Sequence, residues 1–136
     1  MRRALADTGP LVALLNRNDT HHERARGFFR RFDGVLFTTW PVLTEASHLL
    51  PLHARAGFVR WVARGGVTLR EISADRISAV ATMMERYADH PMDLADASLI
   101  CLADAIGVTD IITVDQAGFD TYRTGAGKRF KNLFLP

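Results

Sequence analysis

The chain has 136 residues, which fits one domain, because two cores of half that size would each be very small. Its composition, 48% hydrophobic and 24% charged, excludes a disordered or low-complexity protein, and no apolar run reaches the roughly 20 residues of a membrane span. The formal net charge of +2 does not by itself indicate a protein that binds nucleic acid. We therefore expect a single domain over residues 1–136 with a packed core.

Strands alternating with helices are predicted in the first part of the chain. An apolar strand over 3–6 runs into DTGP at 7–10, where a capping residue and an early proline are typical of the start of a helix. Apolar residues at helical spacing predict a second helix over 22–32. A turn then leads to a strand over 35–39, so the order of elements is that of a βαβ unit.

The same alternation is predicted to continue to the last acidic segment. Proline and glycine residues separate the next elements, which are helices over 41–50 and 54–63 and a strand over 67–72. A cap at Ser73 or Asp75 opens a helix to about Tyr87, with Ile77, Val80, Ala81 and Met84 on one face. A helix over 93–106, apolar almost all round and therefore buried, ends at Gly107, and a strand over 110–114 ends on Asp115.

This order of elements predicts an α/β fold, a three-layer α/β/α sandwich with a mainly parallel central sheet, because right-handed crossovers place helices on both faces. The single Cys101 lies in an apolar run, which is typical of a buried thiol in a reducing compartment. Asp7 and Gly9 interrupt the apolar stretch near the N-terminus, so it does not read as a signal peptide. We expect a cytoplasmic protein with no membrane segment.

Two acidic residues follow predicted strands at the same edge of the sheet. Asp7 and Asp115 both fall where a strand ends, and ligands of open parallel sheets bind beyond the carboxyl ends of the strands. A carboxylate can also cap a helix or start a turn, and either residue would do so well. From the residues alone, the site and the cap are equally good explanations.

Glu45 and Asp96 are harder to explain as surface residues. Glu45 lies in the apolar stripe of its predicted helix, so its carboxylate needs a cation, a metal or good donors, and a salt bridge to an arginine is the alternative. Asp93 and Asp96 match a capping box at the start of the apolar helix. That explanation suffices for Asp93, whereas Asp96 is also placed near the edge of the sheet.

If Asp7, Glu45, Asp96 and Asp115 converge, their mutual repulsion raises some of their pKa values, and a divalent cation relieves it. Oxygen ligands favour Mg²⁺ or Mn²⁺ over zinc, because none of the five histidines has a zinc-like spacing. We interpret His21 and His22 as a surface pair at the start of a helix. Basic residues cluster at 24–31, 55–64 and 123–131, and solvated helix faces and a basic tail are the favoured explanation for each cluster.

Four segments carry a resemblance that spans essentially the whole chain: ADTGPLVAL at 6–14, LTEA at 43–46, ADASLI at 95–100 and TVD at 113–115. In their order and spacing, the sequence resembles the PIN-domain family, especially the toxin ribonucleases of bacterial VapBC-type toxin–antitoxin modules. The resemblance implies an acidic quartet that binds Mg²⁺ or Mn²⁺, formed by Asp7, Glu45, Asp96 and Asp115, with Thr8 and Thr113 as supporting hydroxyls and Asp93 as an additional acid.

The resemblance also implies what the protein acts on and binds. It implies hydrolysis of RNA phosphodiester bonds by a metal-activated water, with basic clusters outside the cleft holding flanking phosphates. It further implies a homodimer and a small antitoxin protein whose segment enters the acidic groove. A noncatalytic RNA-binding or interaction module, or an RNA-processing factor of the same fold, is the alternative.

Two other α/β families with acids at strand ends fit less well. A receiver domain needs a paired acid near the first strand and a lysine after the last, but Asp7 has no adjacent acid and Lys128 comes well after Asp115. A phosphatase of the haloacid-dehalogenase type needs a second aspartate two positions after the first, where this chain has Gly9. Both classes are therefore disfavoured.

Overall fold

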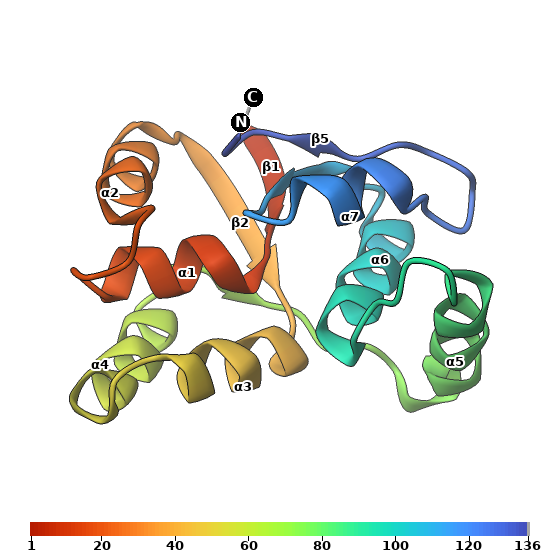
Figure 1. Ribbon diagram of the computed structural model, residues 1–136, viewed down its shortest axis with the longest axis horizontal. Coiled ribbons are helices and arrows are strands. Elements are labelled where there is room, and N and C mark those ends of the chain that lie inside the picture. The colour runs from red at the N-terminus through yellow and green to blue at the C-terminus, as the bar shows by residue number, and fades with distance from the viewer. Residues whose placement is uncertain (136) are drawn as a thin grey trace.

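The computed structural model describes residues 1–135 and is built around a parallel sheet of five strands in the order β3-β2-β1-β4-β5 (Figure 1). The paired strands among these residues all run parallel, and β1 lies in the middle because it pairs with β2 on one side and β4 on the other. The strands are β1 (Arg2–Ala6), β2 (Gly34–Thr38), β3 (Thr68–Leu69), β4 (Asp110–Ile112) and β5 (Lys131–Asn132).

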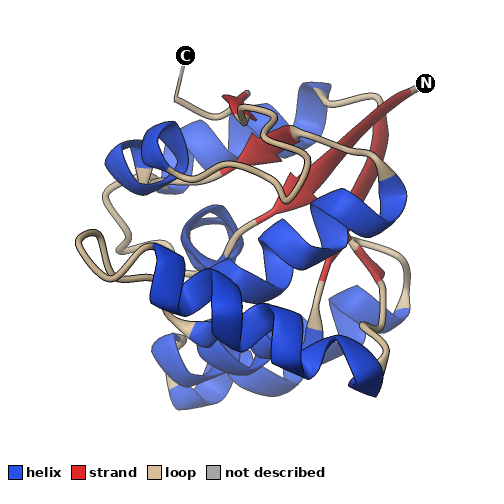
Figure 2. Cartoon of the chain, turned by 90° about the vertical axis from the view of Figure 1, so that its right-hand side faces the viewer, coloured by secondary structure: helices blue, strands red, loops and turns tan. Residues whose placement is uncertain are grey.

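Helices surround this sheet, and Figure 2 shows the strands in the interior with helices around them. The first helix packs on the second and third, and the sixth packs on the third and fifth. The helices are α1 (Thr8–Leu15), α2 (His22–Arg31), α3 (Trp40–Leu49), α4 (Leu52–Ala63), α5 (Ile77–Arg86), α6 (Leu94–Ile106) and α7 (Gln116–Thr121). The predicted α/β sandwich with a mainly parallel sheet is confirmed.

The core forms where α6 lies against the sheet. Leu5 of β1, Ile111 of β4 and Leu99 of α6 are completely buried, and Cys101 is a buried free thiol, as expected. The helix ends at Gly107, whose φ of 68° lies in the left-handed region that favours glycine. An apolar helix of this kind is stabilised by burial from all sides, which explains why its sequence shows little amphipathic pattern.

Several boundaries differ from the sequence expectations. The predicted strand over 67–72 contains only two paired residues, because it lies at the edge of the sheet, and α7 and β5 were not predicted. A short 3₁₀ turn at Ala74–Arg76 precedes α5, and the Ser73 side chain makes no capping hydrogen bond there. Ile77 is 68% exposed, so the predicted apolar face of α5 is only partly covered.

The parallel order brings the ends of three strands to one edge of the sheet. Asp7 follows β1, Thr39 follows β2 and Thr113 follows β4. The backbone continues this alignment past the strands, because the Asp7 N–H donates to the Ile112 carbonyl over 3.0 Å. In Figure 1, α1, α3 and α6 meet beyond the carboxyl ends of β1 and β2, and the candidate site lies there. No helix among residues 1–135 is long and apolar enough to cross a membrane.

Candidate functional site

A cavity of about 300 Å³ lies at this edge of the sheet, and half of the residues that line it are acidic. The strand ends supply Asp7 and Asp115, α3 supplies Glu45, and the start of α6 supplies Asp93 and Asp96. The other residues that line it are Thr8, Gly9, Val12, Asp19, His21, Leu49 and Val114. The structure thus brings the predicted acids, which are far apart in the sequence, around one pocket, which we call the acidic pocket.

Asp7 is the most buried of these acids, with only 6% of its surface exposed. It occupies the position before α1, but its side chain makes no capping hydrogen bond. Instead, the Thr113 hydroxyl donates to Asp7 Oδ2 over 2.7 Å. Burial raises the pKa of Asp7 to about 6, although the Thr113 hydrogen bond acts in the opposite direction. The explanation of Asp7 as a helix cap is therefore wrong.

Asp115 combines both of the roles that the sequence allowed. Its Oδ1 accepts a hydrogen bond of 3.0 Å from the Gly118 N–H and so caps α7, while the residue also lines the acidic pocket. Its own N–H donates to the Thr113 hydroxyl over 2.9 Å. A Cβ at Gly118 would collide with Asp115 Oδ2, so this turn requires glycine for close approach. Thr113 therefore links the two strand-end acids.

Asp93 and Asp96 form the predicted capping box at the start of α6. Asp93 Oδ1 accepts from the Asp96 N–H over 2.9 Å, and Asp96 Oδ2 accepts from the Asp93 N–H over 3.3 Å. Burial, followed by the negative charges of Asp7 and Asp93, raises the pKa of Asp96 to about 8. The cap accounts for the position of Asp93, but it leaves the Asp96 carboxyl group among other acids.

Glu45 lies half-buried on α3 and faces the same group of acids. Burial and then the negative charge of Asp93 raise the pKa of Glu45 to about 7. The ion pairs within residues 1–135 are Arg2 with Asp110 and Arg26 with Glu23, so the alternative of a salt bridge between Glu45 and an arginine is wrong. The negative charge of this side chain is therefore not balanced by a neighbouring side-chain cation.

The chemistry of the donors fits a hard divalent cation. The lining residues include no lysine or arginine within the described part of the chain, and the buried Thr8 hydroxyl has no hydrogen-bond partner there. Carboxylate and hydroxyl oxygens are the ligands that Mg²⁺ prefers. No three His, Cys, Asp or Glu side chains among residues 1–135 are already close enough to hold a metal ion. Asp93, Asp96 and Asp115 each accept a backbone N–H on one carboxylate oxygen, which leaves the second oxygen of each available to a metal ion.

The remaining predicted residues have more ordinary surroundings. Asp120, in the helix after the last acidic segment, is exposed. In the basic cluster at 55–64, Arg55 donates to the carbonyls of His48 and Leu50, so part of that cluster holds loops rather than facing free solvent. Arg123 likewise donates to nearby backbone carbonyls. The exposed arginines at 24, 26, 30 and 31 agree with the solvated helix face that we favoured.

His21 and His22 are not the surface pair that the sequence suggested. Both are half-buried, and His21 lines the acidic pocket together with Asp19. The loop between α1 and α2 folds back to this edge of the sheet, and no helical or strand periodicity in the sequence indicates that return. Sequence reasoning therefore missed two residues of the pocket.

Comparisons with known proteins agree with this architecture. No family model matches the chain. The chain is 25% identical over 130 residues to Ribonuclease VapC26 of Mycobacterium tuberculosis, a match that covers 93% of this chain and 96% of that protein. Its fold is similar to the crystal structure of VapC20 of Mycobacterium tuberculosis, a toxin that cleaves the sarcin-ricin loop, with a TM-score of 0.77 and 20% identity, over 83% of this chain and 90% of that one. The resemblance drawn from the four sequence segments is thus confirmed.

Proposed function

We propose, from the likeness of this chain to VapC-type PIN domains, that it is a ribonuclease that hydrolyses RNA phosphodiester bonds, acting as the toxin of a VapBC-type toxin–antitoxin system. The observation that carries the proposal is the gathering of Asp7, Glu45, Asp96 and Asp115 around one pocket. Burial raises the pKa values of Asp7, Glu45 and Asp96, and clustered carboxylates of this kind with no side-chain cation to balance them are typical of functional sites rather than of structural ones.

Asp7, Glu45, Asp96 and Asp115 would hold Mg²⁺ or Mn²⁺, which supplies an activated water and neutralises charge on the scissile phosphate. Thr113 orients the Asp7 carboxylate through its hydroxyl and holds the backbone of Asp115 in place. The buried Thr8 hydroxyl is available as a further oxygen donor. The protein holds these acids close together, which disfavours their ionisation and costs stability that the cation restores.

The substrate must bring a polyanion to a pocket lined by acids. The basic residues outside the pocket, such as Arg24, Lys128 and Arg129, are exposed and can hold flanking phosphates. Such contacts position a strand without reading its sequence. RNA binding should therefore weaken as salt concentration rises, while the choice of RNA depends on contacts nearer to the cleavage point.

An antitoxin is the expected protein partner, and the surface beside the acidic pocket suits one. Trp40 and Leu94 are 57% and 56% exposed, and they line a groove that also includes Glu45 and Asp93. A large exposed apolar side chain next to acids matches a partner segment with an apolar residue followed by a basic one. We propose that the antitoxin occupies this groove, places a cation among the acids and so blocks the RNA.

We also propose a cytoplasmic homodimer of single-domain chains. The half-covered α5, with Ile77 exposed beside an apolar cavity of about 420 Å³, offers a surface that a second copy could bury. Light scattering on the purified protein measures the mass directly. A monomeric mass at all concentrations would contradict the proposed dimer but would not contradict the proposed ribonuclease activity.

The experiment that tests the ribonuclease measures cleavage of single-stranded RNA by the purified chain with Mg²⁺ or Mn²⁺ and with EDTA. We expect cleavage with metal and none with chelator. Activity that persists in EDTA would overturn the metal mechanism. RNA binding without any cleavage, under every metal tested, would instead favour a noncatalytic RNA-binding module.

A further inference from the structure

We infer that His21 binds a phosphate oxygen of the RNA backbone at the edge of the acidic pocket. This inference rests on the proposed ribonuclease function and adds a substrate-binding residue to it. His21 lies outside the acidic quartet, on the loop between α1 and α2, and it is half-buried at the pocket wall.

The loop holds His21 in place without any ligand. Its backbone N–H donates to Asp19 Oδ1 over 2.8 Å, so the only acid next to it in the loop is engaged by the backbone. Its ring meets the ring of Phe134 edge-on, with centroids 6.2 Å apart. These two contacts leave the ring nitrogens without an assigned hydrogen bond among the described residues. A ring fixed in this way can bind a ligand at little entropic cost.

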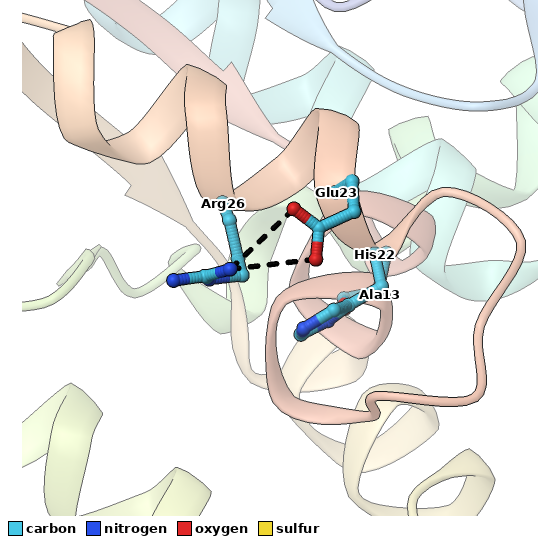
Figure 3. A network of polar contacts seen from close by, with 4 residues as sticks. All are labelled: Ala13, His22, Glu23 and Arg26. Atoms are coloured by element: carbon cyan, nitrogen blue, oxygen red, sulfur yellow. Dashed lines mark hydrogen bonds and ion pairs between the residues drawn. The ribbon is translucent and has the colours of Figure 1, made fainter.

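The neighbouring residue anchors the same loop from the other side. His22 Nδ1 donates to the Ala13 carbonyl over 2.6 Å, and Figure 3 shows His22 beside Ala13, with the ion pair that the next residue, Glu23, makes with Arg26 one turn further along α2. The His22 N–H also donates to the Asp19 carbonyl over 3.0 Å. His22 is therefore a structural residue, whereas His21 is one of the residues that line the acidic pocket.

The charges around the pocket explain why a phosphate would use His21. Within residues 1–135, it is the only Lys, Arg or His among the residues that line the acidic pocket. A metal-bound phosphate still has oxygens that face away from the metal, and these need donors. A neutral imidazole always carries one N–H and a protonated one carries two, so the contact does not depend on the titration of the ring.

The test compares His21→Ala, His21→Asn and, as a matched control, His53→Ala on the exposed face of α4. The probe is a fluorescent pool of single-stranded RNA of random sequence, because a phosphate contact is independent of base identity. The dissociation constant is measured with Mg²⁺ in an Asp96→Asn background to prevent hydrolysis, and KM and kcat are measured in the otherwise wild-type chain.

We expect His21→Ala to weaken RNA binding about ten-fold, as loss of a hydrogen bond to a charged oxygen does. The amide N–H of His21→Asn should restore most of the affinity, and His53→Ala should leave it unchanged. In ¹⁵N-labelled protein, the RNA should shift the His21 ring resonances and leave those of His22 in place.

Two failures are distinguishable. If the wild-type chain neither binds nor cleaves RNA, the proposed function falls and this inference with it. If the wild-type chain does both but His21→Ala binds RNA as tightly as His53→Ala, only the inference is overturned. Equal losses in His21→Ala and His21→Asn would assign the effect to packing on Phe134 and would also overturn it.

Discussion

At the scale of single residues, the chemistry of the site depends on acids whose ionisation the fold makes unfavourable. Asp96 is the clearest case, because burial and three neighbouring carboxylates raise its pKa to about 8. A protonated carboxyl group binds a divalent cation poorly, so the metal must compete with a proton at this position.

Asp96→Asn should therefore separate catalysis from folding. The neutral amide removes a metal ligand, so we expect kcat to fall on the order of 100-fold or more, as loss of an electrostatic catalytic group does. It also removes a charge from the crowded pocket, so thermal unfolding in EDTA at pH 8 should occur at a higher temperature than in the wild type. Asp120→Asn on the exposed face of α7 is the control and should change neither value. Full activity of Asp96→Asn would remove the residue from the mechanism.

Thr113→Val tests the link between the two strand-end acids. Valine keeps the shape but removes the hydroxyl that donates to Asp7 and accepts from the Asp115 N–H. We expect the pKa of Asp7 to rise further and the pH of half-maximal rate to move up by about one unit, the size expected for one hydrogen bond to a carboxylate. The measurement is the pH profile of cleavage, with Thr82→Val on the exposed side of α5 as the control. An unchanged profile would show that Thr113 only stabilises the fold.

At the scale of the elements, the start of α6 has two roles that substitution can distinguish. Asp93 caps the helix, and its negative charge raises the pKa of both Glu45 and Asp96. The first role needs only a hydrogen-bond acceptor, and the second needs the charge. Asp93→Ser therefore removes the charge but keeps a hydrogen-bond acceptor, whereas Asp93→Ala removes both.

We expect Asp93→Ala to lower the free energy of unfolding by about 1 kcal/mol, the usual cost of an N-cap. Asp93→Ser should recover most of that stability and retain RNA cleavage, with a pH profile shifted to lower pH because a negative charge is gone. Chemical denaturation and the cleavage profile measure the two effects. If Asp93→Ser folds as the wild type does but loses activity, Asp93 is a ligand as well as a cap.

The elements also show which parts of the candidate site can be predicted from the sequence. Strand-end positions and the capping box placed Asp7, Asp93, Asp96 and Asp115 correctly, because short-range patterns encode them. The same patterns did not distinguish the buried, hydrogen-bonded Asp7 from a helix cap, since that choice depends on Thr113, 106 residues away. The edge strand β3 was predicted too long, whereas the two-residue strand β5 and the return of the His21 loop carry no periodicity and were missed for that reason.

At the scale of the whole molecule, the acidic pocket makes stability depend on pH. The folded-state pKa values of Asp7, Glu45 and Asp96 are raised to about 6, 7 and 8. The folded state therefore holds more protons than the unfolded state above pH 4, and the free energy of unfolding falls as pH rises through these values. For Asp7 alone, which is almost fully buried, the loss is on the order of 3 kcal/mol.

We therefore expect the melting temperature in EDTA to fall between pH 5 and pH 8.5. Mg²⁺ or Mn²⁺ should reduce this fall, because a cation bound only to the folded state stabilises it. Circular dichroism across a pH series, with and without metal, makes the measurement, and Asp96→Asn should flatten the curve. A melting temperature that is constant with pH in EDTA would contradict the crowding of acids in the pocket.

The burial of Asp7 and Asp96 also affects the enthalpy that is measured when a cation binds. Near pH 7 Asp96 still carries a proton and Asp7 has lost most of its own, and a cation that binds Asp96 must expel that proton into the buffer. The enthalpy measured by titration calorimetry should therefore change with the ionisation enthalpy of the buffer. The slope of the measured enthalpy against the ionisation enthalpy of the buffer gives the number of protons released. Loading the site is in this sense an exchange of one kind of positive charge for another.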